Sequence, residues 1–476
     1  MKPRLQERGQ ALILIALAAV GLFGFSALAI DGSRVFSDRR HAQNTADTAA
    51  LAAALAKIRG DSYTVAAEQR AKSNGYMTDA DSTVEVNLCS DPAITTACQG
   101  IPTSGDPNQM DPANYIQVKI TSTIPATFGR IVGRNIFTSV LTSVAYAGPV
   151  KPQPLVNGSA LAAMSRDEKD AIYGAGTMDL DVNNSGIFSN SAYTDSGCMH
   201  GSMRTAGTGT YTVDTSIQVA GSFCKNFNST VDLSKVELTS SIAYPPAISI
   251  PIPNFSCGGV TGSTSNDIVN GIETITYHPG NFGQKEVVNG TKPVNFSPGT
   301  YCFSNGLSLN GPKVIANSVR FLFTGGDFQI NGSEFTCNDV LVHINGGKGI
   351  DFGGSSNIFC NSVTFIASTG SVTWNGAVET RIYAPKGGDY QGVLLYLPYP
   401  NSDPIKINGN STIELTGSII GVASPISVNG NDWSTGLHSQ IIGNTVNLDG
   451  NGTMVIDYDP AEQYLQVDPS AIKLTK

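Results

Sequence analysis

The C-terminal half of the chain repeats one short pattern: NSVRFLF at 317–323, NDVLVHI at 338–344 and NSVTFIA at 361–367. The steps between the copies are 21 and 23 residues. Within each copy, apolar residues recur at every second position, as in a strand that buries one face. A period near 21 that holds two or three short strands is typical of one coil of a parallel β-helix.

A second sequence mark recurs at nearly the same interval. It consists of a residue pair that ends in Gly: Asn310-Gly311, Asn331-Gly332, Phe352-Gly353, Asn375-Gly376, Asn408-Gly409, Asn429-Gly430 and Asp449-Gly450. Asn and Gly adopt the positive φ angles that turn a chain between the faces of a coil. A β-sandwich is the rival interpretation, but its turns recur every 8–12 residues without a constant longer step. We therefore expect the β-helix.

Composition narrows the class of protein further. The chain has 476 residues and a net charge of −9, and only 14% of its residues are charged. An acidic chain lacks the basic face that nucleic-acid binding requires, so we expect no nucleic-acid partner. Gly is abundant at 51 residues, which suits short strands joined by tight turns.

The N-terminal region carries the only long apolar run. Residues 11–30 (ALILIALAAVGLFGFSALAI) contain no charge, and twenty helical residues cross the roughly 30 Å of bilayer hydrocarbon. The Ala27-Leu28-Ala29 triplet leaves open a cleaved signal peptide, Met1–Ala29. An uncleaved anchor is favoured, because the helical pattern continues through 33–58 without Gly or Pro. Small residues form its apolar stripe: Ala42, Ala46, Ala49, Ala50 and Ala53.

The fold class that follows is mainly β: an N-terminal transmembrane helix and a small α+β domain, followed by a parallel β-helix. The alternating segment YIQVKITST at 115–123 is the clearest strand of the small domain, which is pilin-like in outline. A plain membrane-proximal spacer is the alternative for that region. The expected parts are the anchor at 1–58, the small domain at 59–147, a Pro-rich linker at 148–156, β-rich early coils or a cap at 157–256, and the β-helix at 257–476.

All eight cysteines follow the apolar run, and none has CxxC spacing. An even number at wide spacing favours disulfides in an oxidising compartment over reduced thiols, which places the N-terminus in the cytoplasm and the body outside. Cys337 and Cys360 each precede a repeat Asn, so they should stack in neighbouring coils. Cys89 and Cys98 bracket a turn-rich segment. Order along the chain alone suggests the other candidate pairs, Cys198 with Cys224 and Cys257 with Cys302.

Four short segments of the N-terminal region stand in a fixed order: ERGQA at 7–11, AIDG at 29–32, AQN at 42–44 and ADTAALA at 46–52. With these segments the region resembles that of TadG-like proteins of the Flp/Tad pilus-assembly system, which share a TadE/TadG-type N-terminal region. Its motif residues here are Gly9, Gln10, Asp31, Gly32, Gln43 and Asp47. The resemblance implies an anchor in the bacterial inner membrane, an exported body, and a role in pilus assembly and surface attachment. It also implies pilus-assembly proteins or pilins as partners.

Two departures from related patterns matter. Type IV-like pilins carry Glu five residues after the processing Gly, whereas this chain has Leu14 at that position, which argues against cleavage after Gly9. Many TadG-like proteins also carry a von Willebrand factor A domain with a DxSxS metal site, and this sequence contains no DxSxS.

The sequence shows no pattern typical of an enzyme site. Acidic residues of the expected coils are scattered in the repeat register, at Asp327, Asp339, Asp351 and Asp389. Arg320 and Arg381 have no acidic partner in register, and His343 should point outward from its strand. We expect no catalytic residues, no metal and no cofactor. Four tyrosines near the insertion at 377–405 either bind carbohydrate or protein, or cover the edge of the solenoid: Tyr383, Tyr390, Tyr396 and Tyr399.

The sequence thus predicts a membrane-anchored, exported structural or adhesive protein associated with Flp/Tad-type pili. The alternative is a secreted β-helix protein that binds or cleaves polysaccharide. Surface glycans are a further candidate partner. The sequence does not name the surface that is bound or the oligomeric state.

Overall fold

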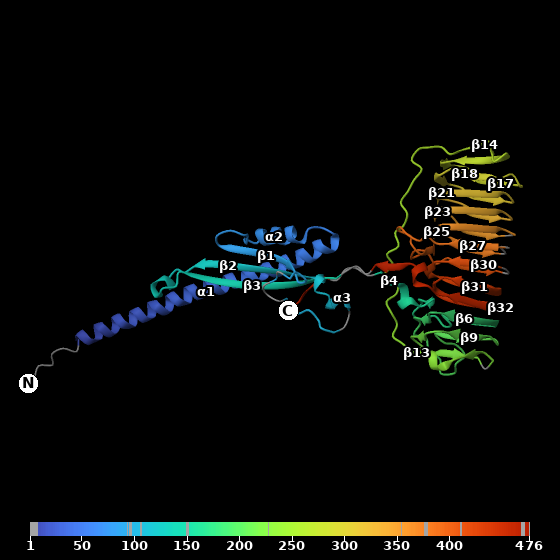
Figure 1. The fold of residues 1–476 in the computed structure, drawn as a ribbon. Coiled ribbons are helices and arrows are strands. Elements are labelled where there is room, and N and C mark those ends of the chain that lie inside the picture. Colours follow the sequence, from blue (N-terminus) through green and yellow to red (C-terminus); the bar gives the residue numbers. More distant parts are fainter. Residues whose placement is uncertain are drawn as a thin grey trace, which may run out of the picture. The chain divides into compact units, whose positions relative to one another are not determined.

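The computed structural model describes residues 8–92, 94, 98–104, 107–148, 152–226, 228–353, 355–375, 379–409, 412–467 and 472–475. The chain forms two compact units (Figure 1). The first consists of Met1–Lys151 together with Val467–Lys476, and the second of Pro152–Gln466. The sequence analysis assigned all residues from 257 to 476 to the β-helix. It did not anticipate that the last residues return to the first unit.

The first unit is built on one long helix, α1 (Arg8–Arg59). Its 52 residues extend about 78 Å at 1.5 Å per residue. The apolar run forms its N-terminal half. The predicted alanine stripe lies on its C-terminal half and has no exposed surface, at Ala42, Ala46, Ala49, Ala50 and Ala53.

A four-stranded antiparallel sheet packs on that alanine stripe. Its strands in spatial order are β1 (Ser82–Leu88), β2 (Tyr115–Pro125), β3 (Ile136–Ala147) and β34 (Ile472–Thr475). Small alanine side chains allow Ile116, Val118 and Ile120 of β2 to approach the helix closely. Short elements complete the unit: α2 (Tyr63–Ser73), α3 (Pro107–Met110), and 3₁₀ turns at Pro112–Asn114 and Gly129–Val132. The predicted small α+β domain is confirmed.

The second unit is a parallel β-solenoid of about 13 turns over residues 161–456, as the sequence predicted. Its N-terminal strands are β5 (Leu161–Ala163), β6 (Ile172–Asn183), β7 (Ile187–Ser189), β8 (Met203–Thr205), β9 (Thr210–Val213), β10 (Ile217–Val219), β11 (Phe223–Lys225), β12 (Thr230–Val231) and β13 (Val236–Leu238). The strands that follow are β14 (Ser263–Val269), β15 (Ile272–His278), β16 (Gly280–Phe282), β17 (Glu286–Asn289), β18 (Val294–Phe296), β19 (Gly299–Phe303), β20 (Leu307–Asn310), β21 (Lys313–Phe323), β22 (Asp327–Asn331), β23 (Glu334–Ile344), β24 (Gly349–Gly353), β25 (Asn357–Ala367), β26 (Ser371–Asn375), β27 (Glu379–Tyr383), β28 (Val393–Tyr396), β29 (Ile405–Gly409), β30 (Thr412–Thr416), β31 (Ser418–His438) and β32 (Ile441–Asp457). Strands β4 (Pro152–Pro154) and β33 (Leu465–Val467) pair where the chain enters and leaves, and 3₁₀ turns lie at Leu155–Gly158, Leu233–Lys235 and Pro460–Glu462.

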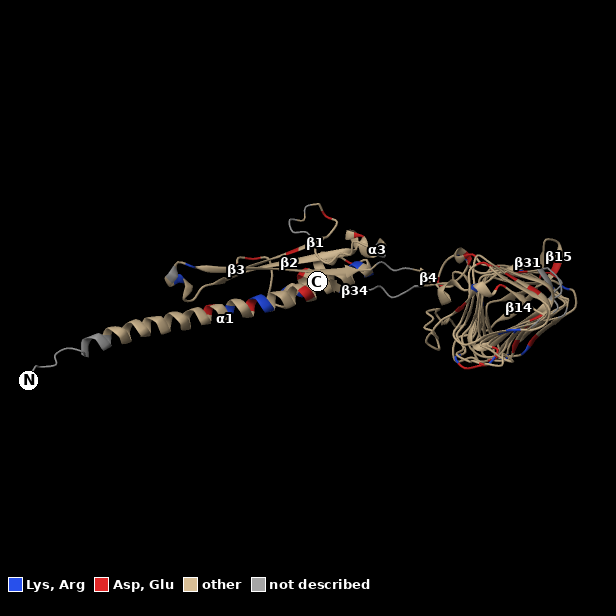
Figure 2. Cartoon of the chain, turned by 90° about the horizontal axis from the view of Figure 1, so that it is seen from below, with Lys and Arg blue, Asp and Glu red and all other residues tan. Residues whose placement is uncertain are grey.

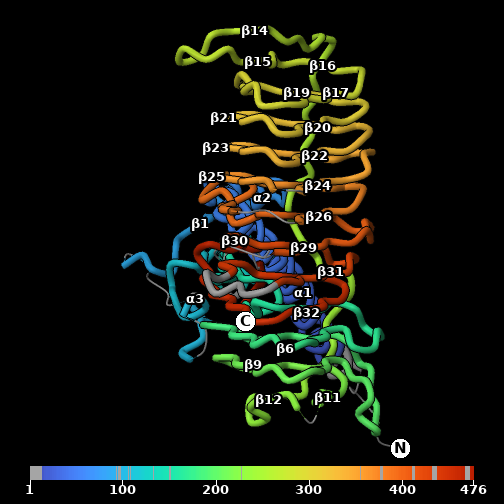
Figure 3. The backbone as a smooth tube through the Cα atoms, turned by 90° about the vertical axis from the view of Figure 1, so that its right-hand side faces the viewer, coloured from blue at the N-terminus to red at the C-terminus, as the bar shows by residue number. Residues whose placement is uncertain are grey.

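The coils do not stack in the order of the chain. Strand β32 pairs with β31 on one side and with β5 and β6 on the other, so the last coil closes on the first. Residues 161–238 therefore form one end of the stack, and the β14–β15 hairpin forms the opposite end. In Figure 3 the red C-terminal coils lie between the green and the orange ones.

Side chains stack in register along the solenoid. Inside, the ring centroids of Phe303 and Phe323, from neighbouring coils, lie 5.2 Å apart. On another face, asparagines of the Asn-Gly marks form a ladder, in which the side-chain amide of Asn310 donates to Asn289 at 2.9 Å and that of Asn331 donates to Asn310 at 3.2 Å. The regular step of the sequence thus reflects both a buried apolar stack and a polar ladder.

Residues 239–262, here called the strap, connect the two ends of the stack (Figure 1). Ile250 of the strap packs against outward side chains of several coils, among them Leu341 and Ile366. The strap also buries His343, which is 2% exposed, and the ring of Phe255 lies 6.4 Å from its imidazole. His343 thus points outward from its strand, as predicted. It is nevertheless shielded from solvent, because a segment distant in the sequence covers that face.

Candidate membrane-anchoring site

The N-terminal half of α1 presents an apolar surface to the outside of its unit. Leu14, Phe23 and Phe25 are 66%, 76% and 75% exposed. Within the described residues, α1 is the one helix long and apolar enough to cross a membrane. Such a surface is unfavourable in water and favourable in hydrocarbon. The helix is consistent with a single-pass membrane anchor.

Asp31 lies just after the apolar run and binds the loop between β2 and β3. Its carboxylate accepts hydrogen bonds from the backbone N–H groups of Thr127 at 3.0 Å, Phe128 at 2.9 Å and Gly129 at 2.7 Å. Arg34, which lies about one turn after Asp31 on α1, donates a hydrogen bond to the hydroxyl of Thr127 in the loop. Burial acts to raise the pKa of Asp31, but the three donors outweigh it, so this pKa lies below its ordinary value. Asp31 thus holds the 3₁₀ turn Gly129–Val132 against the helix.

A mostly apolar cavity of about 550 Å³ lies between α1 and this loop. Residues of the helix line one wall, and those of the loop and the start of β3 line the other. The helix contributes Gly24, Ala27, Leu28, Asp31, Gly32, Val35, Phe36 and Arg39, and the hairpin contributes Phe128, Gly129, Ile131, Arg134 and Phe137. The loop therefore lies beside the last turns of the apolar run.

The other motif residues of the resemblance occupy different places on α1. Gly9 and Gln10 lie in its first turn, and the side chain of Gln10 lies outside the described residues. Gly32 lines the cavity. Gln43 donates to the carboxylate of Asp47 at 2.8 Å, one helical turn away. Only Asp31 and Gly32 of the six thus meet at the loop contact.

A second carboxylate on α1 was missed by the sequence analysis. Asp38 accepts hydrogen bonds from the Tyr76 hydroxyl at 2.9 Å and the Ser122 hydroxyl at 3.0 Å. Burial, together with the carboxylate of Asp38, raises the pKa of Tyr76. These partners lie 38 and 84 positions away, and no local pattern could have joined them.

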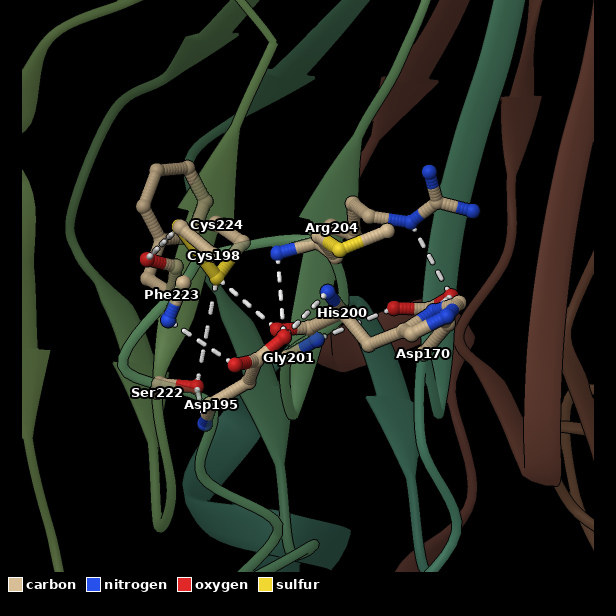
Figure 4. The surroundings of a disulfide bond; sticks show 11 residues. Asp170, Asp195, Cys198, His200, Gly201, Arg204, Ser222, Phe223 and Cys224 are labelled. Carbon is tan, nitrogen blue, oxygen red and sulfur yellow. Dashed lines mark hydrogen bonds and ion pairs between the residues drawn. A yellow bond between two sulfur atoms is a disulfide. The ribbon is translucent and has the colours of Figure 1, made fainter.

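The solenoid brings one histidine and one carboxylate together (Figure 4). His200 Nδ1 lies 2.7 Å from Asp170 Oδ2, and Arg204 Nε lies 3.0 Å from the same oxygen. The Arg204 guanidinium also lies 4.4 Å from the ring centroid of Tyr173. The nearby Cys198–Cys224 disulfide links neighbouring coils. The cluster joins adjacent turns, and no group of three metal-ligating side chains occurs in the described part of the chain.

Two arginines have acidic partners that the sequence analysis did not find. Arg320 forms an ion pair with Asp339 of the next coil at 2.8 Å. Arg381 pairs with Glu379 at 2.8 Å and lies 3.9 Å from Glu414. The expectation that neither arginine has an acidic partner in register holds for Arg320, whose register partner is Leu341. It is wrong for Arg381, whose register partner is Glu414, because the long insertion between them changes the 21-residue step.

The acidic residues named above come together in two pairs. Asp339, which forms an ion pair with Arg320, and Asp389 line the same cavity of about 340 Å³. Burial, followed by the negative charge of Asp327, raises the pKa of Asp351. These two carboxylates lie on adjacent strands, β22 and β24.

The tyrosines near 377–405 mainly cover the flank of the solenoid. Tyr396 is buried in the apolar cluster under the strap, and Tyr390 packs against that cluster. Tyr399 is 54% exposed and makes an edge contact with Tyr244 of the strap, with 6.4 Å between ring centroids. Packing therefore accounts for most of this group.

The eight cysteines form four disulfides: Cys89–Cys98, Cys198–Cys224, Cys257–Cys302 and Cys337–Cys360. The sequence analysis named the same pairs as candidates. Cys337 and Cys360 are register partners on β23 and β25. Cys257–Cys302 attaches the strap to β19.

A helix with an apolar half and a sheet-packed half, joined to a disulfide-braced solenoid, is consistent with a single-pass membrane-anchored protein. Residues 9–56 match the model of a family described as putative Flp pilus-assembly TadE/G-like. The matched segment covers the whole apolar run, Asp31 and the buried alanine stripe. Searches of curated proteins and of solved structures returned no match.

Proposed function

We propose that this chain is a structural protein of a Flp/Tad-type pilus apparatus, anchored in the bacterial inner membrane with its N-terminus in the cytoplasm. The observation that carries the proposal is the coincidence of the family match at 9–56 with the membrane-spanning and sheet-packed parts of α1. The solenoid then serves as an exported body that contacts pilus proteins or a surface.

Two features support an exported body without catalysis. All four disulfides follow the apolar run, which fits an oxidising compartment. Several ion pairs along the solenoid join neighbouring coils, as that of Arg320 with Asp339 does. Polysaccharide-cleaving sites, by contrast, need convergent carboxylates in a cleft rather than carboxylates held in ion pairs between coils.

The test places charges within the apolar run. The double variant Leu17→Arg, Leu22→Arg should leave the membrane fraction and abolish surface pili, because each central Arg costs about 2.5–3.5 kcal/mol of insertion free energy. The matched control Leu233→Arg, Leu238→Arg changes exposed leucines of the solenoid. Normal piliation with the first variant would contradict the proposal and favour the polysaccharide-binding alternative.

Orientation is tested separately by thiol labelling. In cells making the full chain, a membrane-permeant maleimide should add no mass to the denatured protein before reduction, and eight labels after it. Free thiols before reduction would place the body in the cytoplasm and contradict the proposed topology.

A further inference from the structure

We propose that the loop joining β2 and β3, together with the first two residues of β3 (residues 126–137, the hairpin tip), is a second membrane contact that enters the lipid interface on the body's side. The proposal rests on the membrane anchoring proposed above. It adds an interaction surface whose partner is the bilayer, recognised by exposed apolar side chains and nearby arginines.

The first argument is depth. The hairpin tip and α1 line a common cavity that reaches back to Gly24 on the helix. Gly24 lies six residues before the end of the apolar run, which corresponds to about 9 Å along the helix axis. If the apolar run lies in hydrocarbon, the hairpin tip cannot stay in bulk water.

The second argument is the exposure of large apolar side chains at that depth. Ile131 is 83% exposed, Ile136 is 58% exposed and Phe128 is 37% exposed. Phe36, on the facing part of α1, is 64% exposed. Contiguous apolar side chains at a loop tip mark a contact surface, and continuity with the apolar run selects lipid as the partner.

The third argument is that seven backbone N–H groups of the hairpin tip already have partners within the protein. Asp31 accepts from three successive N–H groups, those of Thr127, Phe128 and Gly129. Within the loop, the N–H groups of Ala126, Ile131, Gly133 and Arg134 donate to carbonyls of the loop itself. A non-helical loop can approach hydrocarbon only when its polar backbone groups are satisfied by protein.

The fourth argument is charge. Arg130 and Arg134 of the tip and Arg34 and Arg39 of α1 are exposed. Figure 2 shows Lys and Arg in blue at the turn of the β2–β3 hairpin and on α1, next to a stretch of α1 without charged residues. Arginines at the edge of an apolar patch extend their guanidinium groups to anionic headgroups while their stems stay in the apolar layer.

The experiment measures immersion depth in the full chain. Its cysteines are all in disulfides, so Ile131→Cys gives one reactive thiol for a nitroxide label. The protein is reconstituted into phosphatidylcholine–phosphatidylglycerol vesicles, and collision with oxygen is compared with collision with a water-soluble nickel chelate. Ile15→Cys, within the apolar run, is the lipid reference. Ile268→Cys, on β14 and 78% exposed, is the water reference.

The proposal expects positions 15 and 131 to favour oxygen and position 268 to favour nickel. If position 15 favours oxygen while position 131 matches position 268, the anchor stands and the hairpin contact is overturned. If position 15 favours nickel, the anchor itself fails and the proposal falls with it.

The arginines are tested in the same system. Arg130→Gln with Arg134→Gln should make the label at position 131 shallower in vesicles that contain phosphatidylglycerol, and should change little in phosphatidylcholine alone. Lys285→Gln with Lys386→Gln, on the solenoid, is the charge-matched control. An equal loss of depth in both lipid mixtures would overturn headgroup recognition.

Discussion

Asp31 joins segments of the chain that lie 96 to 98 positions apart. It does so at the level where the apolar run of α1 ends, so one carboxylate fixes the hairpin relative to that run. Three backbone donors on one carboxylate are a charge-assisted arrangement that a neutral side chain cannot reproduce.

The first prediction concerns this carboxylate. In Asp31→Asn, one oxygen becomes an NH₂ group that cannot accept from the loop. The amides of residues 127–129 should then exchange with solvent roughly tenfold faster, as loss of such hydrogen bonds implies. Hydrogen exchange on the full chain in detergent checks this. Asp47→Asn, which removes a carboxylate bonded to Gln43 on the helix surface, should not change exchange at 127–129.

The second prediction concerns His343, whose imidazole is buried under the strap. Burial lowers its pKa below the ordinary value of 6.5. The unfolded chain therefore binds a proton at a pH where the folded chain does not, so stability should fall as the pH drops below about 6.5.

Urea unfolding of the full chain at a series of pH values measures this dependence. His343→Gln should make the stability less steep with pH in that range. Phe255→Ala should do the same by admitting water to the imidazole, since Phe255 is the aromatic neighbour in the strap. An unchanged slope in both variants would show that another group is responsible.

At the scale of elements, α1 has two halves with different surroundings. Large apolar residues are exposed on its N-terminal half, whereas alanines pack beneath the sheet on its C-terminal half. The long strands of the solenoid repeat one pattern by contrast, since β21, β23 and β25 bury apolar side chains against those of neighbouring coils.

The third prediction tests that stacking. Phe321 on β21 is fully buried, and its ring contacts those of Phe296 and Phe303. Phe321→Ala should lower the free energy of unfolding by about 3–5 kcal/mol through lost burial and a residual cavity. Lys313 lies on the same strand as Phe321 and forms an exposed ion pair with Glu334 of β23. Lys313→Ala, which breaks this pair, should cost less than about 1 kcal/mol of unfolding free energy. Similar urea midpoints for the two variants would contradict the stacked interior.

At the scale of the whole molecule, the solenoid is an insertion within the fold of the first unit. The chain leaves after β3 and returns as β34, which pairs with β3. Within the solenoid, the β14–β15 hairpin ends one side of the stack, and β13 with its preceding 3₁₀ turn ends the other. Irregular ends of this kind hinder pairing with further strands.

The fourth prediction follows from the register. Ala147 and Ile472 are paired residues of neighbouring antiparallel strands, so a tight Asn-Gly turn can replace residues 148–471. The shortened chain should fold and enter the membrane. The exchange protection of β2 should match that of β2 in the full chain. The far-ultraviolet circular dichroism of the shortened chain should show the helix and the sheet of the first unit. Loss of protection throughout β2 would show that the first unit depends on the solenoid.

The sequence by itself determined the elements whose signal is periodic. The step near 21 specifies coils because each coil must place its apolar residues over those of the coil before. The apolar run and the alanine stripe specify α1 because helix faces repeat within a few residues. Of the family residues, Asp31 was singled out from the sequence, but its partners at 127–129 were not.

Only the tertiary structure decided how distant segments meet. It closed the last coil on the first, laid the strap over His343, brought Asp339 to Arg320 and set the hairpin tip beside the end of the apolar run. None of these contacts follows a fixed spacing, so no periodic pattern in the sequence records them. They arise because surfaces left uncovered by local structure must be buried by whichever segment the folded chain brings near.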